Sequence, residues 1–106
     1  MFEKLRGMFA IAIWDAPRKR LVCARDLFGI KPFYYTVQDG AAGPQFIFAS
    51  EIKCILEHPA YQRELNEEAL EQYLCFQFSA LDETFFKGIF KLAPAHCMTV
   101  HTDGSI

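Results

Sequence analysis

The order of the predicted elements indicates an α+β fold. Residues 8–48 contain four short apolar segments that read as β-strands, residues 50–77 contain two segments with helical periodicity, and residues 97–101 return to a strand pattern. Runs of strands followed by helices are typical of layered α+β domains, whereas a doubly wound sheet would alternate the two. A chain of 106 residues is long enough for one small domain, so we expect one unit over residues 1–106.

The strands come first. Both alternating faces of residues 8–14 are apolar, which predicts a strand buried on both sides, and the alanines at 10 and 12 indicate close approach of another layer. Residues 15–18 break the pattern and residues 21–24 resume it, which predicts an antiparallel hairpin with a solvated basic turn. Residues 33–37 and 46–48 are the third and fourth predicted strands, and Gly43 and Pro44 are assigned to the turn-rich connection between them.

Two helices follow. Ser50 is the predicted N-cap of the first helix, with Glu51 in its first turn, and the His58-Pro59 pair ends it. Asn66 is the predicted N-cap of the second helix, whose apolar stripe is Leu70, Tyr73 and Leu74. Residues 85–92 are ambiguous because Gly88 interrupts the pattern, and residues 97–101 form the last predicted strand.

Composition and charge exclude several classes of protein. The sequence is 52% hydrophobic and 15% aromatic, which argues against disorder, and its net charge of −2 argues against a nucleic-acid-binding surface. No apolar run approaches the ~20 residues of a membrane helix. The four cysteines (Cys23, Cys54, Cys75 and Cys97) are widely spaced in apolar surroundings, so we expect reduced, buried thiols in a cytoplasmic protein.

A self-contained active site is not apparent in the sequence. Neither a G-x-S-x-G elbow nor a glycine-rich phosphate loop is present, and the three histidines lack metal-ligand spacing. His96 and Cys97 are neighbours on a predicted strand, so their side chains would point to opposite faces and would not form a catalytic pair. We therefore expect no catalytic residue and no metal ligand in this chain.

The segment from Arg25 to Pro32 combines an acid–base doublet, a glycine and a proline in one connection. Gly29 is suited to a positive φ or to close approach of another segment. Arg25 and Asp26 follow an apolar strand and need partners if they are buried, and Glu51 and Lys53 are the candidates. From the residues alone, a structural ion-pair network of these four side chains is favoured over a catalytic role.

Several motifs together resemble one family, the glutaminase (class II amidotransferase) domain of glutamine-hydrolysing asparagine synthases. They are Leu5-Arg6-Gly7-Met8-Phe9-Ala10, Ala12-Ile13-Trp14-Asp15, Ala24-Arg25-Asp26, Gly29-Ile30-Lys31-Pro32, Phe48-Ala49-Ser50-Glu51-Ile52-Lys53, Glu64-Leu65-Asn66 and Phe85-Phe86-Lys87-Gly88-Ile89. The resemblance implies part of an N-terminal-nucleophile (Ntn) hydrolase fold, an αββα sandwich in which two antiparallel sheets lie between helical layers.

The resemblance also implies a function for the parent protein. In the family an N-terminal cysteine hydrolyses glutamine, and ammonia passes through a tunnel to a synthetase domain that activates aspartate with ATP and magnesium. Residue 2 here is Phe2, so we expect this chain to be a partial glutaminase domain that lacks both the catalytic part and the synthetase domain, binds no cofactor and is inactive alone. Met8 and Ile30 match residues that line the ammonia tunnel, although periodicity alone would make both ordinary core residues.

Two alternatives stay open at this stage. The parent could be a related amidotransferase that acts on another carboxylate, because the acceptor is chosen in the synthetase domain. The chain could also be a non-catalytic binding or assembly module.

Overall fold

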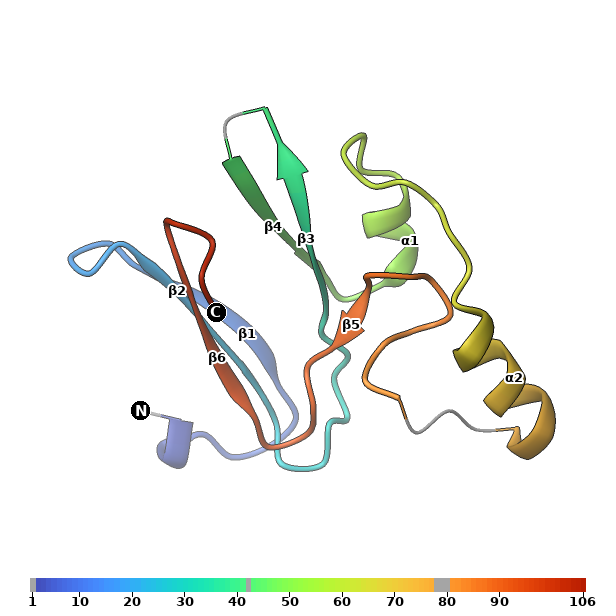
Figure 1. Ribbon diagram of the computed structural model, residues 1–106. Coiled ribbons are helices and arrows are strands. Elements are labelled where there is room, and N and C mark those ends of the chain that lie inside the picture. The colour runs from blue at the N-terminus through green and yellow to red at the C-terminus, as the bar shows by residue number, and fades with distance from the viewer. Residues whose placement is uncertain (1, 42, 78–80) are drawn as a thin grey trace.

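The computed structural model describes residues 2–41, 43–77 and 81–106. A 3-10 turn at Phe2–Lys4 precedes four strands, then two helices, then two more strands (Figure 1). The elements are β1 (Ala10–Asp15), β2 (Arg20–Arg25), β3 (Tyr34–Gly40), β4 (Gly43–Ala49), α1 (Ile52–Leu56), α2 (Glu67–Phe76), β5 (Phe90–Lys91) and β6 (Cys97–His101). The α+β class is confirmed, and both helices follow the first four strands as expected.

The first sheet has the strand order β1-β2-β6 and is antiparallel throughout. The predicted hairpin is confirmed, since β1 and β2 pair from Ala10 opposite Arg25 to Asp15 opposite Arg20. One face of this sheet carries small and medium-sized apolar side chains, and Ala10 and Ala12 pack there against the buried Cys23. These two alanines lie at a close approach of the second sheet, as the sequence indicated.

The second sheet has the order β4-β3-β5, also antiparallel, and it meets the first through aromatic side chains. The rings of Phe33 and Phe48 stack with centroids 5.5 Å apart, and Tyr35 lies 5.8 Å from Phe46. Phe33 and Leu92 complete the core between the two sheets together with Cys23. Such stacked or tilted aromatic pairs contribute about 0.5–1.5 kcal/mol each beyond the area they bury.

The opposite face of the second sheet packs beneath α1. Ile55 of α1 and Ile89 are fully buried there, and Tyr61 donates a hydrogen bond from its hydroxyl to the Lys87 carbonyl (2.7 Å). The layers are therefore sheet, sheet and helix, with both helices beyond the second sheet (Figure 1). This arrangement is consistent with an Ntn-like α+β fold. Within the described residues, neither helix is long and apolar enough to cross a membrane.

The start of α2 confirms one helix-cap prediction, and α1 corrects the other. The Asn66 side chain accepts a hydrogen bond from the backbone N–H of Ala69 (3.2 Å), as an N-cap should. The N-cap of α1 is Glu51 rather than Ser50, and the Glu51 side chain makes no capping hydrogen bond. The strand β4 runs through Ala49 and displaces the helix start by one residue.

Two strand predictions also need correction, and the structure assigns one segment that the sequence left ambiguous. Residues 8–14 are not buried on both sides. On the face turned away from the second sheet Ile13 is 38% exposed, because no helix covers that face within the described chain, and on the other face Met8 and Trp14, at the two ends of the segment, are 63% and 55% exposed. Gly43 and Pro44 belong to β4 rather than to a turn. Pro44 is tolerated because β4 is an edge strand, where a missing N–H breaks no ladder bond. The ambiguous segment contains β5, a strand of two residues.

Candidate functional site

An open hollow of about 800 Å³ lies where the start of β1 meets the loop after β2. Met8 and Ile30, the two predicted tunnel residues, both line it, although they are 22 positions apart in sequence and belong to different segments. Its other walls are largely apolar. The full lining is Phe2, Leu5, Arg6, Gly7, Met8, Phe9, Arg25, Asp26, Leu27, Phe28, Ile30 and Ala95.

Large apolar side chains stand open around the hollow. Leu27 is 68% exposed and Phe28 is 78% exposed, while Met8 and Ile30 are 63% and 56% exposed. Once closed to solvent, the apolar part of such a wall accepts a small neutral molecule and disfavours an ion, because an ion that loses its hydration against it gains no partner. The sequence reasoning did not select Leu27 and Phe28. The sequence did contain a signal that could have identified them, because two bulky apolar residues precede Gly29 in a predicted loop.

Asp26 forms the floor of this region and is almost completely buried, with 1% of its surface exposed. Its carboxylate accepts four backbone N–H groups, those of Phe28, Ile30 and Lys31 at 3.1 Å and that of Phe9 at 3.3 Å. Burial by itself would raise the pKa of Asp26, but the four N–H donors outweigh it and hold the pKa below its usual value. The carboxylate is therefore ionised and structural.

Arg25 binds the carbonyl oxygens of the same loop. Its guanidinium donates to the carbonyls of Gly29 (2.7 Å), Lys31 (2.8 Å) and Leu92 (2.5 Å). The predicted conformation of Gly29 is confirmed in both respects. Its φ is +63°, and a Cβ at this position would lie 2.7 Å from Cγ of Pro94. The doublet and the glycine thus fix the loop that carries Ile30.

The expected ion-pair network is not what the structure contains. Glu51 and Lys53 pair with each other (2.6 Å) at an exposed position, where such a pair contributes little stability. Within the described part of the chain, Arg25 and Asp26 form no ion pair and bind main-chain groups instead. The prediction of that network was wrong because a buried tight loop offers many unpaired backbone groups, and these satisfy both charges without Glu51 or Lys53.

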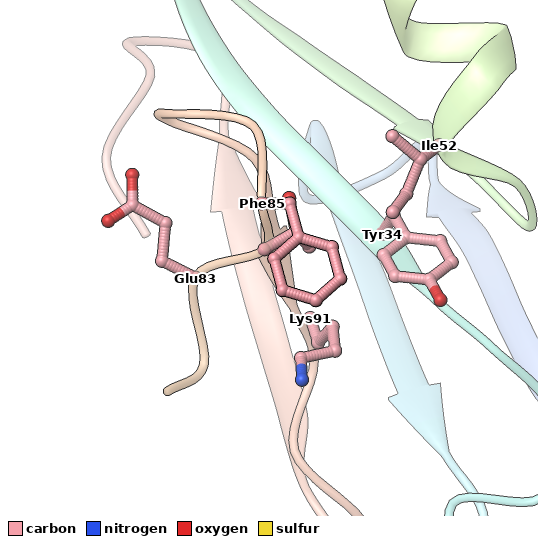
Figure 2. A pocket seen from close by; sticks show the side chains of 6 residues that line it. Tyr34, Ile52, Glu83, Phe85 and Lys91 are labelled. Carbon is pink, nitrogen blue, oxygen red and sulfur yellow. The ribbon is translucent and has the colours of Figure 1, made fainter. Parts of the chain in front are cut away.

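A second cavity lies between β3, α1 and the segment before β5 (Figure 2). Its volume is about 120 Å³, and Tyr34, Ile52, Thr84, Phe85 and Lys91 line it with Glu83. Figure 2 shows the Glu83 carboxylate directed away from the rings of Phe85 and Tyr34. Pockets for drug-sized ligands usually enclose about 300–1,000 Å³, so this cavity is smaller than a typical ligand pocket.

The cysteines and histidines give no alternative centre. All four cysteines are free thiols, but only Cys23 is buried; Cys54, Cys75 and Cys97 are exposed, so the prediction of burial was wrong for these three. Burial raises the pKa of Cys23 to about 11, which disfavours the nucleophilic thiolate. Among the described residues, no group of three or more His, Cys, Asp or Glu side chains could hold a metal ion.

Comparison with known proteins agrees with the motifs in the sequence. The profile described as "Glutamine amidotransferase domain" matches residues 1–106. The chain is 41% identical over 103 residues to glutamine-hydrolyzing asparagine synthetase 3 of Bacillus subtilis, covering 96% of this chain and 16% of that protein. It is 35% identical over 92 residues to putative glutamine-hydrolyzing asparagine synthetase 2 of Methanocaldococcus jannaschii, covering 85% of this chain and 17% of that protein.

One relative bears a different name. Amidase chyE of Penicillium rubens is 39% identical over 92 residues, covering 87% of this chain and 12% of that protein. The chain thus spans less than a fifth of the length of each of these three relatives.

Proposed function

Because the chain belongs to the family of glutamine amidotransferase domains, we propose that it is a segment of a longer, glutamine-hydrolysing asparagine synthase. In this proposal it is a partial type-2 glutaminase domain that supplies the scaffold and one wall of an ammonia tunnel. The catalytic cysteine and the synthetase domain, with its ATP and magnesium, belong to other parts of the same polypeptide. Glutamine and aspartate are the proposed substrates of the whole protein.

The observation that carries the proposal is the convergence of Met8 and Ile30 on one apolar hollow. The reaction first converts glutamine and water to glutamate and ammonia, and ammonia must then reach an activated carboxylate without gaining a proton. An apolar wall favours the neutral molecule over ammonium and excludes bulk water. The hollow is open in this chain, so the proposal requires other parts of the protein to close it.

A direct experiment is to extend the reading frame in both directions and to purify the encoded protein. With glutamine, aspartate, ATP and magnesium we expect glutamate and asparagine to form in about equal amounts, as expected for an ammonia tunnel that is closed to solvent. The 106-residue chain assayed in parallel should release no glutamate. Glutaminase activity in the short chain would overturn the assignment of catalysis to other segments, and a full-length protein without asparagine formation would overturn the proposed acceptor.

A second candidate is an amidotransferase that acts on another carboxylate. The similarity to a protein named as an amidase is the observation that favours this second candidate. The full-length protein would then hydrolyse glutamine and consume ATP with a different acid but not with aspartate. A panel of carboxylic acids with nucleotide release as the readout separates the two candidates. If the protein encoded by the extended reading frame neither hydrolyses glutamine nor consumes ATP, the result would favour a non-catalytic assembly module.

A further inference from the structure

We propose that Asp26, supported by Arg25, is a positioning residue that fixes the two walls of the hollow relative to each other. The inference rests on the proposed function, because it assigns to this buried doublet the task of keeping the ammonia path closed to water. Neither side chain needs to touch ammonia. Both act through the main chain of the residues that form the wall.

The wall residues are not held by their own packing. Met8 and Ile30 are each more than half exposed, and neither belongs to either buried core cluster. A side chain that exposed makes few of the contacts that would fix its position. Within this chain the position of each therefore depends on the backbone from which it projects.

One carboxylate holds both of those backbones. Oδ2 of Asp26 accepts the N–H of Phe9, the residue after Met8, and also the N–H of Lys31. Oδ1 accepts the N–H groups of Phe28 and Ile30. The main chain of Asp26 adds a further link, because its N–H donates to the Phe9 carbonyl (2.9 Å). The segment with Met8 and the loop with Ile30 are thus joined at a single side chain.

Arg25 completes the arrangement from the carbonyl side. The Asp26 carboxylate accepts hydrogen bonds from N–H groups of the loop, and the Arg25 guanidinium donates to the carbonyls of Gly29 and Lys31 in the same loop. The third bond of Arg25, to the Leu92 carbonyl, ties the loop to the residue that follows β5. Hydrogen bonds to charged groups are stronger than neutral ones, so the loop is held more firmly than its exposed side chains would suggest.

The consequence for the reaction is a prediction about nitrogen transfer rather than about hydrolysis. If the loop moves away from the β1 segment, water enters between the walls and ammonia escapes or is protonated. Ammonium has no lone pair with which to attack a carbonyl carbon. Glutamine hydrolysis would continue, but less of the nitrogen released would reach the acceptor.

The test uses Asp26→Asn in the full-length protein. The amide keeps the size of the side chain and one acceptor oxygen, but it turns an NH2 group toward two N–H donors. We expect glutamate formed per asparagine to rise about threefold or more, since small displacements at a reaction path have large effects. The kcat/KM for glutamine hydrolysis and the synthesis supported by added ammonium should stay unchanged. Hydrogen exchange in residues 26–31 should accelerate.

Asp15→Asn is the matched control. Asp15 is likewise a hydrogen-bonded aspartate, but it pairs with the side chains of Arg18 and Arg20, and it lies at the far end of β1. Its removal should leave the product ratio unchanged. Arg25→Lys is a milder second variant, which should raise the ratio in the same direction if Asp26→Asn does not fold.

The possible failures can be told apart. An unchanged ratio with unchanged exchange in residues 26–31 would overturn the positioning role. If glutamine hydrolysis and ammonium-supported synthesis are lost together, Arg25 and Asp26 stabilise the fold as a whole and have no specific role in positioning the walls of the hollow. If the wild-type protein makes no asparagine from glutamine, the proposed function fails instead, and the exchange measurement still decides whether Asp26 fixes the loop.

Discussion

At the scale of single residues, Asp26 and Arg25 depart most clearly from sequence reasoning. Their charges and their place at the end of an apolar strand predicted that they would need partners if buried, and Asp26 is buried. The partners could not be predicted, because four backbone N–H groups of a loop do not appear as a residue type. A pattern of side chains identifies a charged pair more readily than a carboxylate that substitutes for backbone acceptors.

The depressed pKa of Asp26 makes the stability of the chain depend on pH. An unfolded aspartate titrates near pH 3.9, and the folded group titrates lower, so its stabilisation is complete above about pH 5 and is lost as pH falls through the unfolded and then the folded pKa. We expect the urea midpoint of the dilute chain, followed by Trp14 fluorescence, to fall between pH 5 and pH 3. Asp26→Asn should show a shallower fall, and an equal slope in both proteins would contradict the assignment.

Gly29 gives a second prediction at this scale. Gly29→Ala places a Cβ at φ +63° and within 2.7 Å of Pro94, so we expect a loss of about 1–3 kcal/mol from strain and crowding. Gly88→Ala is the control, since Gly88 has a similar positive φ (+74°) but a Cβ there would meet no atom closer than 3.9 Å. Urea denaturation should show the larger loss for Gly29→Ala. Equal losses would mean that backbone strain alone accounts for both.

At the scale of elements, the sequence predicted which helices and strands exist better than it predicted where they begin and end. Alternating apolar residues identified β1 to β4 and β6, and periodicity with a capping asparagine identified α2. The strand β5 was not predicted, because its two residues, Phe90 and Lys91, are too few to show any periodicity. Their pairing with Tyr35 and Tyr34 is set by tertiary contacts. Gly43 and Pro44 resembled a turn because sequence does not show which strand will be at the edge of a sheet.

The helix caps provide a direct test at this scale. Asn66→Ala removes the hydrogen bond to the N–H of Ala69 and should cost about 1 kcal/mol of unfolding free energy. Asn66→Asp should recover most of it, since aspartate caps equally well. Ser50→Ala should stay within about 0.5 kcal/mol, because Ser50 is exposed and lies outside α1. A large loss for Ser50→Ala would restore the capping role predicted from the sequence.

At the scale of the whole molecule, the chain exposes more surface than its mass predicts. Its accessible surface is 7533 Å², whereas a compact 12.2 kDa monomer has about 6,100 Å². The radius of gyration of 14.7 Å also exceeds the ~13 Å of a compact domain of this length. The excess is larger than the ~800 Å² that one partner contributes to a standard interface. Sequence periodicity predicted the apolar residues but not that one layer of neighbours would be lacking.

The outer face of the first sheet is where this excess has the clearest consequence. Ile11, Ile13 and Val22 lie on the side away from the second sheet, where Ile13 is 38% exposed, and both helices lie beyond that second sheet. β1 and β6 are in addition the two edges of this sheet, and unpaired edges favour association. The chain should therefore associate through this surface when it is not covered.

We expect the isolated chain to show a concentration-dependent mass in sedimentation and to bind a hydrophobic dye. Ile13→Lys places a charge on the outer face and should reduce both, because the lysine would lose its hydration on association. Leu74→Lys is the control. Leu74 is more exposed (73%, against 38% for Ile13), but it projects from α2, which lies at the opposite end of the molecule. Equal effects of the two lysines would indicate nonspecific association. Loss of association only in Ile13→Lys would assign the contact to the outer face of the first sheet.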